Sequence, residues 1–138
     1  MNRKTKIAIA FAIIIVGAIY TTISTIVRDE KIDKLKANYR IISCGYITKF
    51  SSYRRFVTVY YAFEYQNKPY SGERTLGGID PDDEPKFQNH TFPVMVDTTD
   101  SSNNAILITP HHFEKMDWKY PDSLTWVLKY YGFKGGSW

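Results

Sequence analysis

The sequence predicts a mainly β protein with one N-terminal transmembrane helix and a small aqueous domain. Residues 7–27 form an uncharged apolar run, and patterns typical of β-strands dominate the chain from residue 40 onward. Turn residues separate the strand-like segments, and helical spacing returns only near the C-terminus. We therefore expect a small antiparallel β-domain of about four to six strands, barrel- or sandwich-like, with two short C-terminal helices.

The apolar run at residues 7–27 is long enough to cross a membrane. About 20 apolar residues in a helix span a hydrocarbon core of roughly 30 Å. A cleaved signal peptide is the first alternative, because small residues at 16–18 suit a signal peptidase. The run continues well past them, however, whereas a secretory apolar region has only about 7–15 residues. An uncleaved signal-anchor is thus favoured, and a soluble core helix is the weakest alternative.

The basic residues that flank this run bear on its orientation. Arg3, Lys4 and Lys6 precede the run, and five basic residues follow it within residues 28–40. The count alone favours a cytoplasmic C-terminal domain. That orientation would move a basic tail across the membrane, and a basic flank before an apolar run is also typical of an export signal. We expect a single-pass protein of the bacterial inner (cytoplasmic) membrane with an extracytoplasmic C-terminal domain.

Composition changes along the chain predict its organisation. A basic flank at residues 1–6 precedes the transmembrane helix at 7–27, a helical stalk at 28–39, the β-rich domain at 40–133 and a flexible tail at 134–138. The predicted contacts are therefore with the lipid bilayer through the apolar run, and with partners through the domain that follows it.

The stalk has the features of an amphipathic helix. Glu30 and Lys34 have the favourable i, i+4 order for an ion pair. Ile32, Leu35 and Tyr39 share the spacing of one apolar stripe. Three apolar positions are too few for a coiled coil, so the stripe is expected to dock on the β-domain.

The most regular strand pattern lies at residues 56–65, where apolar odd-numbered positions alternate with even-numbered ones and predict a buried face. Residues 66–69 supply a turn, and residues 70–76 return as the partner strand. The segment 41–50 is also rich in strand-forming residues, with Gly45 as a plausible bulge.

The remaining segments are shorter. Residues 77–85 form a loop of glycine, proline and acidic residues, and residues 92–97 and 105–109 predict two more strands. Thr109 is an N-cap candidate for a helix over 110–116. Asp122 begins a second helical pattern that stops at Gly132.

Three segments carry a resemblance to known proteins: residues 61–72, 92–97 and 103–107. In this order they resemble an uncharacterised bacterial family of small membrane-anchored proteins carrying a β-rich domain of unknown function. The chain departs from the family pattern at Val96, where tyrosine is usual, and at Thr98, where proline would follow the aspartate. The resemblance extends over roughly residues 40–128. The resemblance implies a β-rich fold and a membrane anchor, and it implies no activity.

Charge and cysteine content argue against two classes of function. Three of the 18 basic residues precede the apolar run, which leaves 15 basic and 14 acidic residues after it. That balance, without a basic stripe, argues against nucleic-acid binding. Cys44 is the single cysteine, so neither an internal disulfide nor a cysteine zinc cluster can form. We expect Cys44 to be a small buried thiol on a strand.

Metal chemistry has few candidate ligands. His111 and Glu114 would share a helix face, and His90 would have to supply a third ligand. Two histidines at the helix start, facing solvent or capping it, are the favoured interpretation. The acidic residues at 80–84 lack the alternating ligand pattern of a calcium loop and are expected to be a solvated loop. No metal, no cofactor and no catalytic residue is therefore predicted.

Aromatic residues are abundant, with 11 Tyr, 8 Phe and 3 Trp. Many must fill the core, but exposed Tyr and Trp are also typical of recognition surfaces. The candidate interaction surface is Phe56, Tyr60, Trp118, Tyr120, Trp126 and Tyr130.

The sequence thus favours a non-enzymatic, membrane-anchored protein-interaction module, such as a subunit or accessory factor of an envelope complex. One alternative is a membrane-held immunity protein that binds a toxin. The other is a small metal-dependent hydrolase that uses His111, Glu114 and His90. Neither the identity of the protein partner nor the oligomeric state follows from the sequence.

Overall fold

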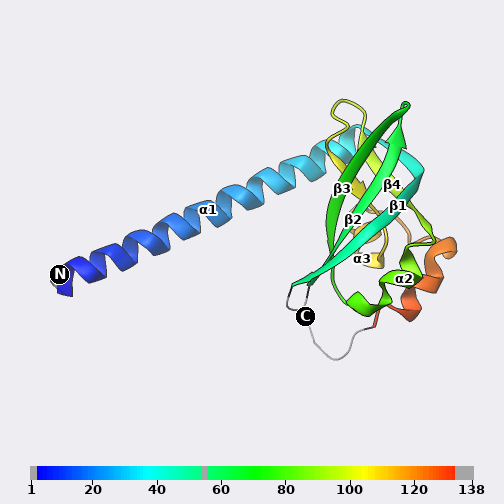
Figure 1. Cartoon of the computed structure of the whole chain (residues 1–138). Coiled ribbons are helices and arrows are strands. Elements are labelled where there is room, and N and C mark those ends of the chain that lie inside the picture. Colours follow the sequence, from blue (N-terminus) through cyan, green and yellow to red (C-terminus); the bar gives the residue numbers. More distant parts are fainter. Residues whose placement is uncertain (1–2, 54–55, 133–138) are drawn as a thin grey trace. The chain divides into compact units, whose positions relative to one another are not determined.

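The computed structural model describes residues 3–53 and 56–132 (Figure 1). The chain divides into two compact units, Met1–Lys34 and Leu35–Trp138. The boundary between them lies inside the predicted stalk. The predicted tail at residues 134–138 lies outside the described residues, as do the side chains of the basic flank at residues 1–6.

Helix α1 (Arg3–Ala37) has 35 residues and includes the whole apolar run. By length and composition it can cross a membrane, and no other helix of the described chain can. Its Thr and Ser side chains at positions 21–25 are compatible with lipid, because the helix backbone accepts their hydrogen bonds. The hydroxyl of Thr21 donates to the Ala18 carbonyl and that of Thr25 to the Thr21 carbonyl, both at 2.9 Å. The predicted pair of Glu30 and Lys34 is confirmed, with N···O at 2.7 Å.

The second unit contains one antiparallel sheet. Its strands are β1 (Tyr39–Tyr53), β2 (Phe56–Tyr65), β3 (Lys68–Leu76), β4 (Thr91–Asp97) and β5 (Asn104–Ile106), in the spatial order β3-β2-β1-β4-β5. The long strand β1 lies in the middle and pairs with both β2 and β4. The predicted antiparallel β-domain is confirmed. The sheet is open, although its edge strands β3 and β5 lie close to each other.

The hairpin of β2 and β3 forms as its sequence predicts. Every odd-numbered side chain of β2 is buried, and Val59 has no exposed surface. The turn is shorter than predicted, because Gln66 and Asn67 alone make it, at φ 52° and 59°. Two positive φ values in succession match the twist of the flanking strands. Pro69 therefore belongs to β3, an edge strand that tolerates the missing N–H.

Gly45 lies at a β-bulge, as predicted. The register between β1 and β4 shifts between Ile42 and Gly45, and the register between β1 and β2 shifts again between Ile47 and Lys49. The glycine is needed because a Cβ atom would overlap Val94 Cγ2 and lie 3.2 Å from the Phe92 carbonyl oxygen. Two residues of β4 thus occupy the space that a larger residue would fill.

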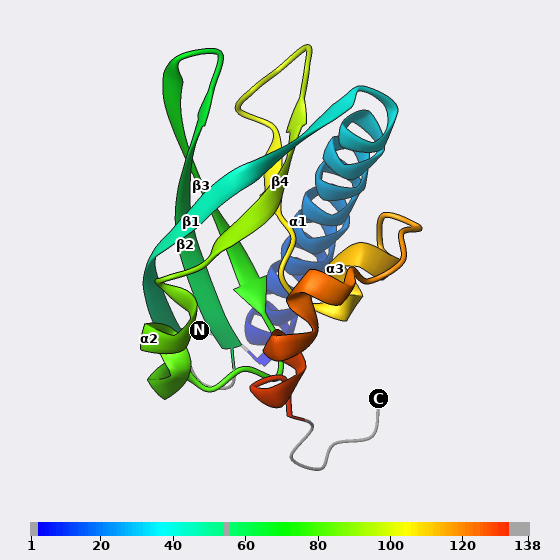
Figure 2. The same ribbon diagram turned by 90° about the vertical axis from the view of Figure 1, so that its right-hand side faces the viewer.

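Four short helices complete the unit: η1 (Pro81–Asp83), α2 (Glu84–Phe87), α3 (Pro110–Glu114) and η2 (Asp122–Lys129). In Figure 2 the helical segments after β3 and β5 gather beside the sheet. Phe87 of α2 packs against Phe50 and Phe92, at ring distances of 5.6 and 6.3 Å. The core therefore lies between these helices and the face of the sheet that carries the odd-numbered residues of β2.

The structure corrects several predicted details. Cys44 is exposed, not buried, because it alternates along β1 with Gly45 and Ile47, which are buried. The stalk helix ends at Ala37, so Tyr39 begins β1 instead of completing the helical stripe. Leu35 of that stripe is buried.

The C-terminal half also differs from the prediction in three places. The loop at residues 77–85 contains η1 and the start of α2, and Phe87 of α2 is fully buried. Strand β5 ends at Ile106, so it is shorter than the predicted strand at 105–109. The last helix is a 3₁₀ helix, and Pro121, not Asp122, is its N-cap.

Candidate functional site

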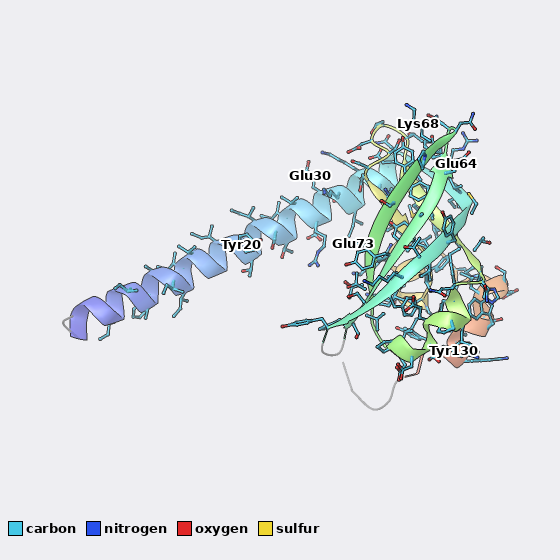
Figure 3. The ribbon with its side chains drawn as sticks, in the orientation of Figure 1. Tyr20, Glu30, Glu64, Lys68, Glu73 and Tyr130 are labelled. Atoms are coloured by element: carbon cyan, nitrogen blue, oxygen red, sulfur yellow. The ribbon has the colours of Figure 1, made fainter. Side chains whose placement is uncertain are left out.

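An open pocket of about 560 Å³ lies at one end of the sheet. The start of β2, the loop after β3 and the end of η2 form its walls. Figure 3 shows Tyr130 at this end of the domain, away from Glu64 and Lys68 near the tip of the β2–β3 hairpin. The lining residues are Phe56, Val57, Gly78, Ile79, Asp80, Pro81, Asp83, Lys129, Tyr130 and Gly132.

Two aromatic side chains form walls of this end pocket. The ring of Tyr130 packs edge-on against Phe87 at 5.8 Å and against Trp126 at 6.2 Å, which fixes its position. Phe56 is 60% exposed, an unusual state for a phenylalanine on a strand. Val57 and Ile79 are almost fully buried and supply an apolar base. Part of the pocket is therefore rigid and apolar.

Charged side chains also line the pocket. The carboxylate of Asp80 accepts a hydrogen bond from the Asp82 N–H at 3.0 Å, which caps η1. The carboxylate of Asp83 makes no cap hydrogen bond at the start of α2. Lys129 contributes one ammonium group. Among the described residues, the lining thus has two carboxylates and one cation around an aromatic wall.

A shallower depression of about 390 Å³ lies on the β1–β3 part of the sheet. Tyr60 and Glu73 face each other across β2 and β3, and Thr48 donates a hydrogen bond to the Tyr60 carbonyl at 3.0 Å. Tyr60 is 38% exposed. The depression is shallow, and more of its lining surface is apolar than polar.

Polar side chains of β2 and of the edge strand β3 bond to the other edge strand, β5. The hydroxyl of Tyr61 donates to the Asn104 side-chain oxygen at 2.7 Å, and Arg74 donates to the Ile106 carbonyl at 3.1 Å. Burial raises the pKa of Tyr61 to about 12 and lowers the pKa of Arg74 to about 10. Arg74 thus connects the two sheet edges, and Tyr61 connects β2 to β5, through side chains instead of backbone pairing.

His112 is buried close to Arg74. Its Nδ1 atom accepts a hydrogen bond from the Ile108 N–H at 3.1 Å, so that nitrogen carries no proton. Burial, reinforced by the nearby positive charge of Arg74, holds the pKa of His112 well below its usual range. The prediction that both helix-start histidines face solvent or cap the helix is wrong for His112, which is a core residue, and fits the exposed His111.

The candidate interaction residues lie in different places. Phe56 and Tyr130 share the end pocket, and Trp126 packs behind Tyr130 against Phe92 at 6.1 Å. Tyr60 lies in the shallow depression. The other two lie away from both.

Trp118 packs edge-on against Tyr39 at 5.0 Å. The Tyr120 hydroxyl lies 3.1 Å from the Ile108 carbonyl oxygen and 2.8 Å from that of Leu124, and burial raises its pKa to about 12. Trp118 and Tyr120 therefore have identifiable structural contacts, whereas Phe56 is largely exposed.

The three candidate metal ligands do not converge. His111 Nδ1 and the Glu114 carboxylate are 3.8 Å apart, as their helical spacing predicts. The ring of His90 instead stacks on Trp126 at 4.0 Å. Within residues 3–53 and 56–132 no three His, Cys, Asp or Glu side chains are grouped to hold a metal ion.

Sequence patterns did not single out the charged lining of the end pocket or the polar connections from β2 and β3 to β5. Asp80 and Asp83 belong to the acidic segment that was expected to be a solvated loop, and only the fold brings them together with Lys129 and Phe56. Arg74 lies at the same alternate positions of β3 as Tyr70 and Leu76, and this spacing is the sequence signal that it faces inward.

Comparison with known proteins gives no relative. No family model, no curated protein and no solved structure matches this chain.

Proposed function

We propose that this chain is a non-enzymatic protein-interaction module, anchored by residues 7–27 in the bacterial inner membrane with its C-terminal domain outside the cytoplasm. The proposed role is that of a subunit or accessory factor of an envelope complex. The observation that supports it best is the end pocket, where exposed Phe56 and fixed Tyr130 line an open cavity. Aromatic side chains in such pockets are common anchors of protein interfaces.

The anchor adds to this proposal. A module held at the membrane meets a membrane partner at a high local concentration, so a small contact area can suffice. The charged and aromatic lining of the pocket also suits recognition of a short segment better than a broad flat interface.

Site-specific photocrosslinking in living cells tests the proposal. Phe56 is replaced by p-benzoyl-phenylalanine, and Tyr46 is replaced in the same way as a control. Tyr46 is 50% exposed and is not among the pocket-lining residues. We expect an adduct of defined mass from position 56 and none from position 46. Absence of an adduct at position 56, or the same adducts at both positions, would contradict the proposal.

A further inference from the structure

We infer that the end pocket receives a positively charged side chain, lysine or arginine, from a segment of the partner protein. This inference rests on the proposed function, and it adds the chemistry of the segment that is bound.

The charge of the pocket lining favours a cation. Of the lining residues that the structure describes, Asp80 and Asp83 contribute two carboxylates, against one ammonium group from Lys129. Within residues 3–53 and 56–132, neither carboxylate forms an ion pair. A partner that covered the pocket with an apolar or acidic segment would desolvate these carboxylates without compensation, which is unfavourable. A cationic group would instead replace the lost water.

The aromatic lining favours a cation on a long apolar stem. Cations bind to the faces of tyrosine and phenylalanine rings, and Tyr130 and Phe56 both line the pocket. The methylene groups of lysine or arginine would pack on Val57 and Ile79, which form the apolar base. A bare metal ion would use neither feature.

The pocket is also organised before binding. Asp80 is held by its bond to the Asp82 N–H, and Tyr130 is held between Phe87 and Trp126. Little side-chain entropy would therefore be lost when the ligand binds.

Direct binding of a basic peptide tests the inference. The full chain is placed in phosphatidylcholine nanodiscs, and fluorescence anisotropy follows dansyl-labelled pentalysine, with dansyl-labelled pentaglutamate as the control peptide. The neutralised variant combines Asp80→Asn with Asp83→Asn, because an asparagine side chain keeps an oxygen that can still cap η1. Lys129→Gln is the matched variant, because it removes a positive charge from the same pocket. Circular dichroism verifies that both variants fold.

We expect pentalysine to bind and pentaglutamate not to bind. The neutralised variant should weaken pentalysine binding by roughly fivefold or more, which corresponds to about 1 kcal/mol. Lys129→Gln should strengthen binding. The inference is overturned if the neutralised variant binds equally well, if Lys129→Gln weakens binding, or if pentalysine does not bind. A specific adduct at position 56 together with any of these results would leave the proposed function in place and remove only the cationic segment.

Discussion

Gly45 offers a sharp test of how the bulge and the core are coupled. Its missing side chain leaves the space that Val94 Cγ2 occupies, and a Cβ atom would also come within 3.7 Å of Ile106 Cδ1. Val94, Phe92 and Ile106 have no exposed surface, so none can move into solvent. Overpacking of this kind costs about 1–3 kcal/mol, and we expect Gly45→Ala to lower the free energy of unfolding by that amount.

A double-mutant cycle separates this clash from other effects of the substitution. Val94→Ala removes two buried methyl groups and should cost roughly 2–3 kcal/mol by itself. In the double variant the new Cβ of residue 45 fills part of the space left by Val94. The double variant should therefore lose less unfolding free energy than the sum of the losses in the two single variants, by at least about 1 kcal/mol.

The assay is urea unfolding of the full chain in detergent micelles, followed by tryptophan fluorescence. Gly77→Ala is the matched control, because a Cβ atom there meets nothing within 4 Å and its φ is not positive. That variant should lie within about 0.5 kcal/mol of the parent. The reasoning would be refuted if the losses of unfolding free energy in the cycle were additive. It would also be refuted if Gly45→Ala lost no more unfolding free energy than Gly77→Ala.

Three further predictions concern the buried polar groups and the anchor. Because burial lowers the pKa of His112 well below its ordinary value of 6.5, the unfolded chain binds a proton more readily. Stability should thus be full above about pH 6.5 and fall as the pH drops below it, and His112→Gln should flatten this dependence in urea unfolding. Tyr61→Phe removes the hydroxyl that bonds to Asn104 and should cost about 1–2 kcal/mol in the same assay, whereas Tyr46→Phe, on an exposed position, should be neutral. Alkaline phosphatase fused to the C-terminus should be active in cells, and an inactive enzyme with an active cytoplasmic reporter at the same position would reverse the orientation.

The sequence predicts the parts of the fold that depend on neighbouring residues. The alternation at residues 56–65 identifies β2 and its buried face, and the uncharged run at 7–27 identifies the apolar part of α1. For β2, one regular period determines which side chains share a face. Strand β1 shows the limit, since two irregularities interrupt its period and Cys44 turns outward.

The end pocket was only partly accessible to sequence reasoning for a different reason. Phe56 and Tyr130 could be selected as aromatic candidates, but their common location depends on how η2 folds back toward the start of β2. Asp80 and Asp83 belong to a turn that has no functional pattern of its own. Such contacts between distant segments are set by packing of the whole core, which local periodicity does not describe.

The proximity of β3 and β5 has a consequence for how the domain behaves at high protein concentration. An open antiparallel sheet normally presents two unpaired edges that can pair with other chains and begin aggregation. Here the Arg74 side chain donates a hydrogen bond to the Ile106 carbonyl of β5. The Tyr61 hydroxyl donates a hydrogen bond to Asn104, which also lies in β5. A strand from another molecule would have to break these bonds and separate the edges before it could add to β5. The side chains of Arg74 and Tyr61 that bond to β5 thus protect the sheet against self-association.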